Sequence, residues 1–197
     1  MHHSGDRQRR LSPFAPEEGT LKGFIERVVI TEAEIQQRVK ELAEQINADY
    51  ADEEIYAICL LKGSLIFTAD LLRHVTVPIT VDMMRTSSYL GATTVSSGSV
   101  KILLDLDRDI ADKNVLIVED IVDTGRTLKK IFDLLQFRKP KTLRICSLLD
   151  KPSRRVEPTD IHYRGFSIDD LFVVGYGLDY DDYYRNLPYI GLLNPNG

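Results

Sequence analysis

Short apolar runs alternate with helical segments along most of this chain. Six segments have the length and apolar content of strands: 55–61, 77–85, 100–104, 115–119, 142–149 and 171–175. Residues 64–74 and 127–137 repeat their apolar positions at helical spacing, and the second of them ends before Pro140. Apolar strands that alternate with helices are typical of a mostly parallel sheet with both faces covered. The pattern therefore predicts an α/β fold, with a mostly parallel, twisted sheet flanked by helices.

A further helix is predicted ahead of the first of these strands. Thr31 and Glu34 have the spacing of a capping box, in which two side chains satisfy the first backbone N–H groups of a helix. The apolar positions that follow recur at helical spacing: Ile35, Val39, Leu42 and Ile46. This combination predicts an amphipathic helix that begins just after Thr31.

Two segments depart from the alternation. Residues 1–20 are polar, contain two prolines and show no period, which predicts a flexible tail. In the segment 86–99, ten of the fourteen residues are Ser, Thr or Gly. A long loop of this kind inside a compact domain is usually functional, although an ordinary β-hairpin turn is the alternative. Tyr89 favours a lid, because such a side chain could close over a ligand.

Composition limits the class of protein. With 197 residues and 43% apolar content, the chain can bury one ordinary core, and a net charge of −5 argues against a dedicated nucleic-acid binder. We expect neither a membrane span nor a signal peptide, since no apolar run is long enough. Cys59 and Cys146 lie inside apolar runs, which indicates buried, reduced thiols and a cytoplasmic protein. A zinc site is not expected, because CxxC, HExxH and histidine clusters are missing from the sequence.

The segment VLIVEDIVDTGRTL (115–128) carries the candidate chemistry. It joins a predicted strand to a predicted helix, and in parallel sheets ligands bind at this end of the strands. Gly125 and the threonines beside it would form a nest of N–H and hydroxyl groups for an anion such as phosphate. Glu119 and Asp120 precede this nest and could accept hydrogen bonds from the vicinal hydroxyls of a sugar. The segment therefore predicts a ligand that contains both a ribose and a 5′-phosphate.

This segment resembles the phosphoribosyl pyrophosphate loop of the type I phosphoribosyltransferases. Further segments resemble the hypoxanthine-guanine branch of that family and follow its order: LLKGSLIFTADLL, SSYLG, SLLDKPSRR and LFVVGYGLDYDDYYRNLPYIG. The resemblance covers roughly residues 22–193, and Arg126 stands where lysine is common. It implies the type I phosphoribosyltransferase fold over residues 21–197, with a small hood formed by about 21–30 and 165–197.

The resemblance also implies roles for residues around the phosphate loop. Glu119 and Asp120 resemble the pair that binds the ribose 2′- and 3′-hydroxyls and lies near the metal. Asp123 resembles the general base, or proton relay, at purine N7. The cradle for the 5′-phosphate would consist of Thr124, Gly125, Arg126 and Thr127.

Further residues match the pyrophosphate and lid positions of the family. Lys62 and Gly63 resemble the pyrophosphate loop, where the family carries a non-proline cis peptide bond. Ser88 and Tyr89 resemble the lid, and Arg185 resembles a contact to pyrophosphate.

The remaining matches concern the base and the metal. Lys151 resembles the donor to the purine 6-oxo group, and Phe172 the side chain that stacks on the base. The backbone of Val173 would read the edge of the base, and Asp179 resembles a carboxylate associated with Mg²⁺. The implied metal ligands are thus Glu119, Asp120 and Asp179.

The implied activity is transfer of the 5-phosphoribosyl group from phosphoribosyl pyrophosphate to N9 of hypoxanthine or guanine. The products would be IMP or GMP and pyrophosphate, with Mg²⁺ as cofactor, in a homodimer or homotetramer that binds neither nucleic acid nor membrane. A xanthine-preferring enzyme and a regulatory RNA-binding protein on the same fold are the alternatives. The match over residues 151–179 disfavours an adenine-preferring enzyme, and the negative net charge disfavours the RNA-binding protein. A receiver domain would not explain the Thr-Gly-Arg-Thr nest.

Overall fold

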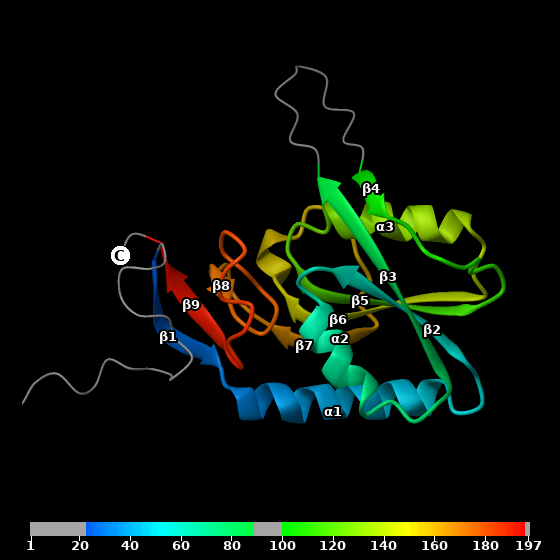
Figure 1. Cartoon of the computed structure of the whole chain (residues 1–197), viewed down its shortest axis with the longest axis horizontal. Helices are drawn as coiled ribbons and strands as arrows, with labels where there is room; N and C mark the ends of the chain where they lie inside the picture. Colours follow the sequence, from blue (N-terminus) through cyan, green and yellow to red (C-terminus); the bar gives the residue numbers. More distant parts are fainter. Residues whose placement is uncertain (1–22, 89–99, 196–197) are drawn as a thin grey trace, which may run out of the picture. The chain divides into compact units, whose positions relative to one another are not determined.

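The computed structural model describes residues 23–88 and 100–195 (Figure 1). The predictions for the tail at residues 1–20 and for most of the segment 86–99 therefore lie outside the described residues. Ser88 is the last residue of a strand, whereas Tyr89 is outside the described part of the chain. The chain divides into two compact units, one of residues 36–170 and one of residues 1–35 with 171–197.

The larger unit is built on a six-stranded sheet. Its strands, in spatial order, are β4 (Val100–Leu104), β3 (Ile79–Ser88), β2 (Ile55–Leu61), β5 (Asn114–Val122), β6 (Thr142–Asp150) and β7 (Tyr163–Ser167). Strands β3, β2, β5, β6 and β7 run parallel, and β4 is antiparallel to β3. The predicted mostly parallel sheet is therefore confirmed.

Helices cover both faces of this sheet. Figure 1 shows α3 (Arg126–Phe137) on one face, and α1 (Glu32–Asp49) and α2 (Leu65–Leu72) on the other. Side chains of α3 pack against alternate residues of the strands in a core of Ile58, Leu60, Val115, Ile117, Leu128, Ile131, Leu135 and Ile145. Because both faces are buried, β2 and β5 need continuous apolar runs rather than alternating ones.

The capping box and the amphipathic pattern predicted near residue 31 are both confirmed. The backbone N–H of Thr31 donates to the Glu34 carboxylate at 2.8 Å, and the N–H of Glu34 donates to the Thr31 hydroxyl at 3.3 Å. Helix α1 follows directly, and its predicted apolar positions are fully buried: Ile35, Val39, Leu42 and Ile46. Cys59 and Cys146 are buried free thiols, as the sequence predicts. Within the described ranges, no helix is long and apolar enough to cross a membrane.

The smaller unit contains a three-stranded antiparallel sheet of β1 (Phe24–Ile30), β9 (Ile190–Asn194) and β8 (Val173–Val174). Its core consists of Val174, Tyr184, Leu187, Tyr189 and Leu193. The predicted strand 171–175 is reduced to two residues, and it ends at Val174 because Gly175 adopts a φ of +101°, which an extended strand does not have. The predicted hood segment 165–197 starts within β7, which pairs with β6 in the larger sheet.

Candidate active site

The order of strands in the larger sheet marks the position of a ligand site. From β2 the chain continues to β3 and β4 on one side, and then returns to form β5, β6 and β7 on the other side. The chain thus changes direction between β2 and β5, and ligands of parallel sheets bind beyond the carboxyl ends of the strands at such a point. We call the residues at the carboxyl ends of β2, β5 and β6 the strand-end cluster: Lys62, Gly63, 119–127 and Lys151.

Gly63 and Asp120 are in close contact within this cluster. Asp120 lies near the end of β5, and Gly63 follows β2 after a cis peptide bond between Leu61 and Lys62. A Cβ atom at position 63 would overlap the carboxylate of Asp120. A larger residue at position 63 would therefore displace the carboxylate of the predicted ribose-binding acid from the predicted pyrophosphate loop. The expected non-proline cis peptide is present.

Glu119 lies in an environment that disfavours its charge. Burial, and after it the negative charge of the neighbouring Asp120, raises the pKa of Glu119 well above its ordinary value. Perturbed carboxyl groups of this kind collect at functional sites, because a structure that only needed stability would pair or omit them. The two acids can accept hydrogen bonds from sugar hydroxyls or supply hard oxygen donors to a cation.

The loop before α3 is shaped to approach an anion. Gly125 precedes the helix with φ of +80°, and a Cβ atom there would lie 2.7 Å from the carbonyl oxygen of Glu157. The carbonyl oxygen of Thr124 accepts hydrogen bonds from the N–H groups of Val156 and Glu157, at 2.9 and 3.0 Å. These two hydrogen bonds hold the loop against the segment at residues 156–157. The N–H groups in the first turn of α3 have no partner within the helix and point outward from its end. Arg126 and Thr127 are exposed at this turn.

Four charged side chains link the ends of β5 and β6 to the segment after β7. The Lys151 ammonium lies 3.6 Å from Asp170, and the Arg154 guanidinium lies 3.5 Å from the other oxygen of that carboxylate. Arg154 also donates to Asp123 at 3.2 Å. The structure thus brings the predicted base-binding lysine and the predicted general base into one chain of ion pairs. Arg154 and Asp170 were not found from the sequence.

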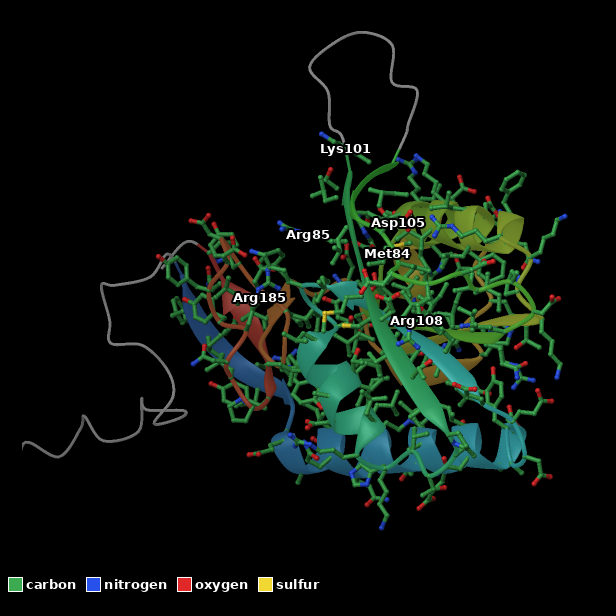
Figure 2. All side chains as sticks on the ribbon, turned by 45° about the vertical axis from the view of Figure 1, so that its right-hand side comes forward. Met84, Arg85, Lys101, Asp105, Arg108 and Arg185 are labelled. Carbon is green, nitrogen blue, oxygen red and sulfur yellow. The ribbon has the colours of Figure 1, made fainter. Side chains whose placement is uncertain are left out.

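Two further cations lie near the strand-end cluster. Arg155 pairs with the buried carboxylate of Asp150 and donates to the carbonyl oxygen of Val122 at 3.4 Å. Arg85 is opposite Leu61 in the register of β3 and β2, and its side chain is exposed (Figure 2). The position of Arg85 opposite Leu61 is not signalled by spacing in the sequence, because it depends on the pairing of two strands.

A second group of predicted residues belongs to the smaller unit. The ring of Phe172 is 49% exposed and meets the Tyr180 ring edge to face, with 5.5 Å between the centroids. Val173 pairs with Leu192 in the sheet. Arg185 (Figure 2) lies 2.7 Å from Asp179 and also donates to the carbonyl oxygen of Gly177 at 2.7 Å. The predicted metal-associated acid and the predicted pyrophosphate contact therefore form an ion pair.

The two acids suit a magnesium ion that takes most of its ligands from water and from a bound phosphate. Glu119 and Asp120 offer adjacent carboxylates, and Mg²⁺ in proteins is usually held by one or two carboxylates together with water and phosphate oxygens. Among residues 23–88 and 100–195, no group of three or more His, Cys, Asp or Glu side chains forms a closed metal site. The arrangement fits an ion that arrives with a phosphorylated ligand.

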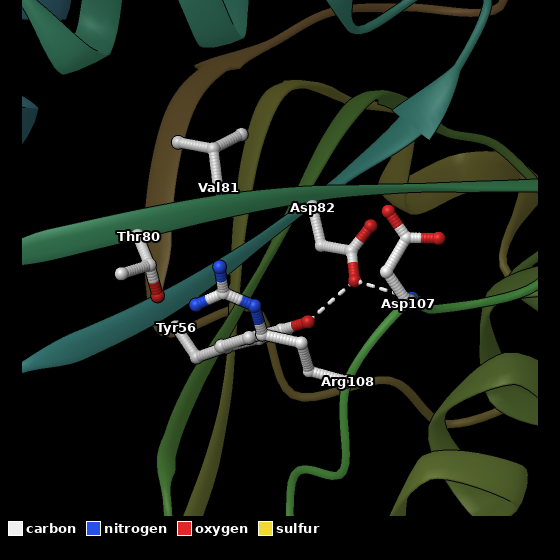
Figure 3. A pocket seen from close by; sticks show the side chains of 6 residues that line it. All are labelled: Tyr56, Thr80, Val81, Asp82, Asp107 and Arg108. Carbon is white, nitrogen blue, oxygen red and sulfur yellow. Dashed lines mark hydrogen bonds between the residues drawn. The ribbon is translucent and has the colours of Figure 1, made fainter.

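A pocket of about 300 Å³ lies elsewhere in the larger unit, near the amino ends of β2 and β3 (Figure 3). It is lined by Tyr56, Thr80, Val81, Asp82, Asp107 and Arg108. The Tyr56 hydroxyl and the N–H of Asp107 both donate to the same oxygen of Asp82, the second at 2.8 Å. Tyr56 and Asp82 are thus paired within the fold, which favours a structural role for these two side chains.

Comparisons with known proteins agree with this geometry. The profile of the phosphoribosyl transferase domain family matches residues 30–181 of this chain. The chain belongs to this family. A hypoxanthine-guanine phosphoribosyltransferase of Bacillus subtilis (strain 168) is 49% identical over 175 residues, which cover 89% of this chain and 97% of the relative. A hypoxanthine phosphoribosyltransferase of Salmonella typhimurium (strain LT2) is 54% identical over 166 residues, covering 83% and 93%.

Solved structures of phosphoribosyltransferases share the fold. A crystal structure of a hypoxanthine phosphoribosyltransferase from Staphylococcus aureus superimposes with a TM-score of 0.83 at 48% identity, covering 87% of this chain and 92% of that one. A hypoxanthine-guanine phosphoribosyltransferase from Bacillus anthracis gives 0.80 at 46% identity, covering 86% and 98%. The type I phosphoribosyltransferase fold expected from the sequence is therefore confirmed.

Proposed function

We propose that this phosphoribosyltransferase transfers the 5-phosphoribosyl group from phosphoribosyl pyrophosphate to N9 of hypoxanthine or guanine. The products would be IMP or GMP and pyrophosphate. The observation that carries the proposal is the strand-end cluster, in which Gly63 lies against the carboxylate of Asp120 and the Gly125 nest opens α3. The names of the relatives support the choice of base.

Each part of the cluster would hold one part of the sugar phosphate. The N–H groups at the start of α3 and the Thr124 and Thr127 hydroxyls would bind the 5′-phosphate. Glu119 and Asp120 would accept hydrogen bonds from the ribose hydroxyls, and the anomeric carbon would then lie beyond the end of β5. The loop at Lys62 and Gly63 would bind the pyrophosphate.

Charge has to be balanced, because the substrate is polyanionic and the protein is itself acidic, with a net charge of −5. Mg²⁺, when bound, would neutralise the pyrophosphate oxygens and stabilise the charge that develops on the leaving group. Glu119 and Asp120 would hold it, and Asp179 is the third carboxylate that the family resemblance associates with the metal. Arg185 and the Lys62 loop would add positive charge at the leaving pyrophosphate.

Proton transfer and base choice would depend on two residues that the ion-pair chain connects. Asp123 would accept or relay the proton of purine N7 as N9 attacks the sugar. Lys151 would donate to the 6-oxo group, because an ammonium has three donors and no acceptor. Phe172 would stack on the base, and the backbone of Val173 would read its edge. A homodimer or homotetramer, and the lid at Ser88 and Tyr89, stay predictions.

The test is pyrophosphate release from phosphoribosyl pyrophosphate and Mg²⁺ with four bases in parallel: hypoxanthine, guanine, xanthine and adenine. We expect turnover with hypoxanthine and guanine. Adenine presents an amino donor where Lys151 needs an acceptor, and such a mismatch is rejected by roughly 10⁴-fold. Lys151→Gln should lose activity chiefly with the oxopurines, since a glutamine amide can donate or accept. Use of adenine at the rate of guanine would refute the assignment, and a marked preference for xanthine would replace it.

A further inference from the structure

Asp170 lies between two cations of the larger unit. One of its carboxylate oxygens is 3.6 Å from the Lys151 ammonium, and the other is 3.5 Å from the Arg154 guanidinium. The carboxylate is about half exposed, whereas the Lys151 side chain is almost fully buried. Asp170 thus pairs with the buried Lys151 through one oxygen and with Arg154 through the other.

Lys151 needs a partner of this kind if its ammonium is to recognise the base. Its backbone is fixed, because its N–H donates to the carbonyl oxygen of Val122 at 3.0 Å directly after β6. Its side chain has four rotatable bonds, so the backbone alone does not fix the position of the ammonium. A buried ammonium is also costly without a nearby negative charge. A carboxylate at 3.6 Å answers both requirements.

Asp170 is in turn positioned by the fold. It follows β7, and the N–H of Ile168, two residues before it, donates to the carbonyl oxygen of Asp150 at 2.9 Å. Arg154 holds its second oxygen from the turn of 3₁₀ helix that follows Lys151. The segment that carries the acid and the segment that carries the lysine are therefore tied together on both sides of the ion pair.

We propose that Asp170 is a positioning residue for base selection, which holds the Lys151 ammonium where the 6-oxygen of the purine binds. This inference rests on the proposed function, in which Lys151 donates to that oxygen. Asp170 itself touches neither the base nor the sugar. Its contribution should therefore appear in the affinity for 6-oxopurines and not in the rate of the chemical step or in the affinity for the sugar phosphate.

The first test is Asp170→Asn, which keeps the size of the side chain and removes its charge. Contacting residues of one network are coupled by an amount that corresponds to roughly 2- to 100-fold, so we expect KM for hypoxanthine and guanine to rise about 10-fold. kcat and KM for phosphoribosyl pyrophosphate should change by less than about 3-fold. Asp170→Glu, which restores the charge, should recover part of the loss.

Asp169→Asn is the matched control. Asp169 is the exposed neighbour of Asp170, and its substitution changes the net charge by the same amount in the same segment. It should leave all three kinetic constants unchanged. An equal rise in KM with Asp169→Asn would mean that long-range charge causes the effect, which would overturn the proposal.

The second test combines Asp170→Asn with Lys151→Gln. If Asp170 acts through Lys151, its substitution should add little to the KM of a protein that already lacks the ammonium. A full additional rise of about 10-fold in the double variant would show that Asp170 acts by another route and would overturn the proposal. A rise in KM for phosphoribosyl pyrophosphate together with lower stability would do the same, because it would show a merely structural role.

Calorimetry provides a readout that does not depend on turnover. Asp170→Asn should weaken binding of GMP about 10-fold and leave binding of ribose 5-phosphate unchanged. If the wild-type protein binds GMP and Asp170→Asn binds it equally well, the role of Asp170 is refuted while the proposed function stands. If the wild-type protein neither binds GMP nor releases pyrophosphate with any base, the proposed function fails, and the role of Asp170 fails with it.

Discussion

Two regions of the larger unit each contain a partly buried carboxyl group, and they shift the pKa of that group in opposite directions. In the pocket near the amino ends of β2 and β3, the Asp82 carboxylate accepts three hydrogen bonds, from the Tyr56 hydroxyl and from the N–H groups of Met83 and Asp107. Burial opposes its charge, but these donors prevail and lower the pKa of Asp82. In the strand-end cluster, burial and the adjacent Asp120 raise the pKa of Glu119.

The difference separates a structural use of charge from a functional one. Asp82 finds its partners within the folded chain, and burial and this carboxylate also raise the pKa of the Tyr56 hydroxyl. Such a closed arrangement stabilises the fold and leaves little for a ligand to gain. Glu119 and Asp120 place like charges side by side, which costs stability in the absence of a ligand. A ligand with hydroxyl donors or a bound cation would relieve that cost.

The largest expected effect concerns Asp123 at the strand-end cluster. Asp123→Asn should lower kcat by about 10²–10⁴-fold, because the amide cannot take the proton of purine N7. Stability should change by about 1 kcal/mol at most, since its ion pair with Arg154 is largely exposed. Single-turnover kinetics and urea unfolding would measure the two quantities. An unchanged single-turnover rate would remove Asp123 from the mechanism.

The second effect concerns Asp82 in the pocket, where a substitution should lower stability and leave turnover unchanged. Asp82→Asn places an amide donor against groups that already donate, so it should lower the free energy of unfolding by about 1–3 kcal/mol while kcat is kept. Asp52→Asn, at an exposed position, is the control and should change stability by less than about 0.5 kcal/mol. Loss of turnover at full stability in Asp82→Asn would show that the pocket has a functional role after all.

The smallest effect concerns Glu119 and its dependence on pH. A carboxyl group with a raised pKa in the folded state destabilises the fold above that pKa, and the penalty disappears below its ordinary value of 4.5. Glu119→Gln should therefore be more stable than the wild type at about pH 8 and lose this advantage as the pH falls. Glu44→Gln, at an exposed position of α1, controls for the loss of one negative charge.

The two regions should also differ in the sign of their pH response. The lowered pKa of Asp82 contributes stability above the ordinary pKa, and this contribution is lost as the pH falls through the folded-state value. Urea titrations between about pH 2 and pH 8 would cover both trends. A Glu119→Gln protein that is less stable than the wild type at the upper end of this range would contradict the contrast between the two regions.

The elements that could be predicted from the sequence are those with continuous apolar runs or clear helical periods. The segment 55–61 coincides with β2, because a buried strand of this length has a distinct composition. The segment 100–104 coincides with β4, an edge strand in which Leu103 and Leu104 are exposed but the apolar run is still continuous. Strand β7 was not predicted, since YRGFS is short and partly polar and becomes a strand only by pairing with the edge of β6. Strands β1 and β9 were missed for a similar reason, because they pair with each other across most of the chain.

Some features of the candidate site could likewise be predicted from the sequence, and others could not. Residue types at strand ends, such as Glu119 and Asp120 before the Gly125 nest, could be predicted, because motif and element lie together in the sequence. The contact of Gly63 with Asp120 and the bridging position of Asp170 could not. Both depend on which strands are neighbours, and local patterns do not contain that information.

The glycine before α3 has a consequence for the stability of the whole protein. Gly125 has no side chain with which to cap the helix, and the side-chain acceptor of its first turn is the Thr124 hydroxyl, 3.4 Å from the N–H of Arg126. A bound phosphate would accept hydrogen bonds from the other N–H groups of this turn. A ligand that binds only the folded state raises the free energy of unfolding as its concentration rises. A phosphate bound at this loop would therefore stabilise the whole protein. Without a bound phosphate, the protein would then be more easily unfolded.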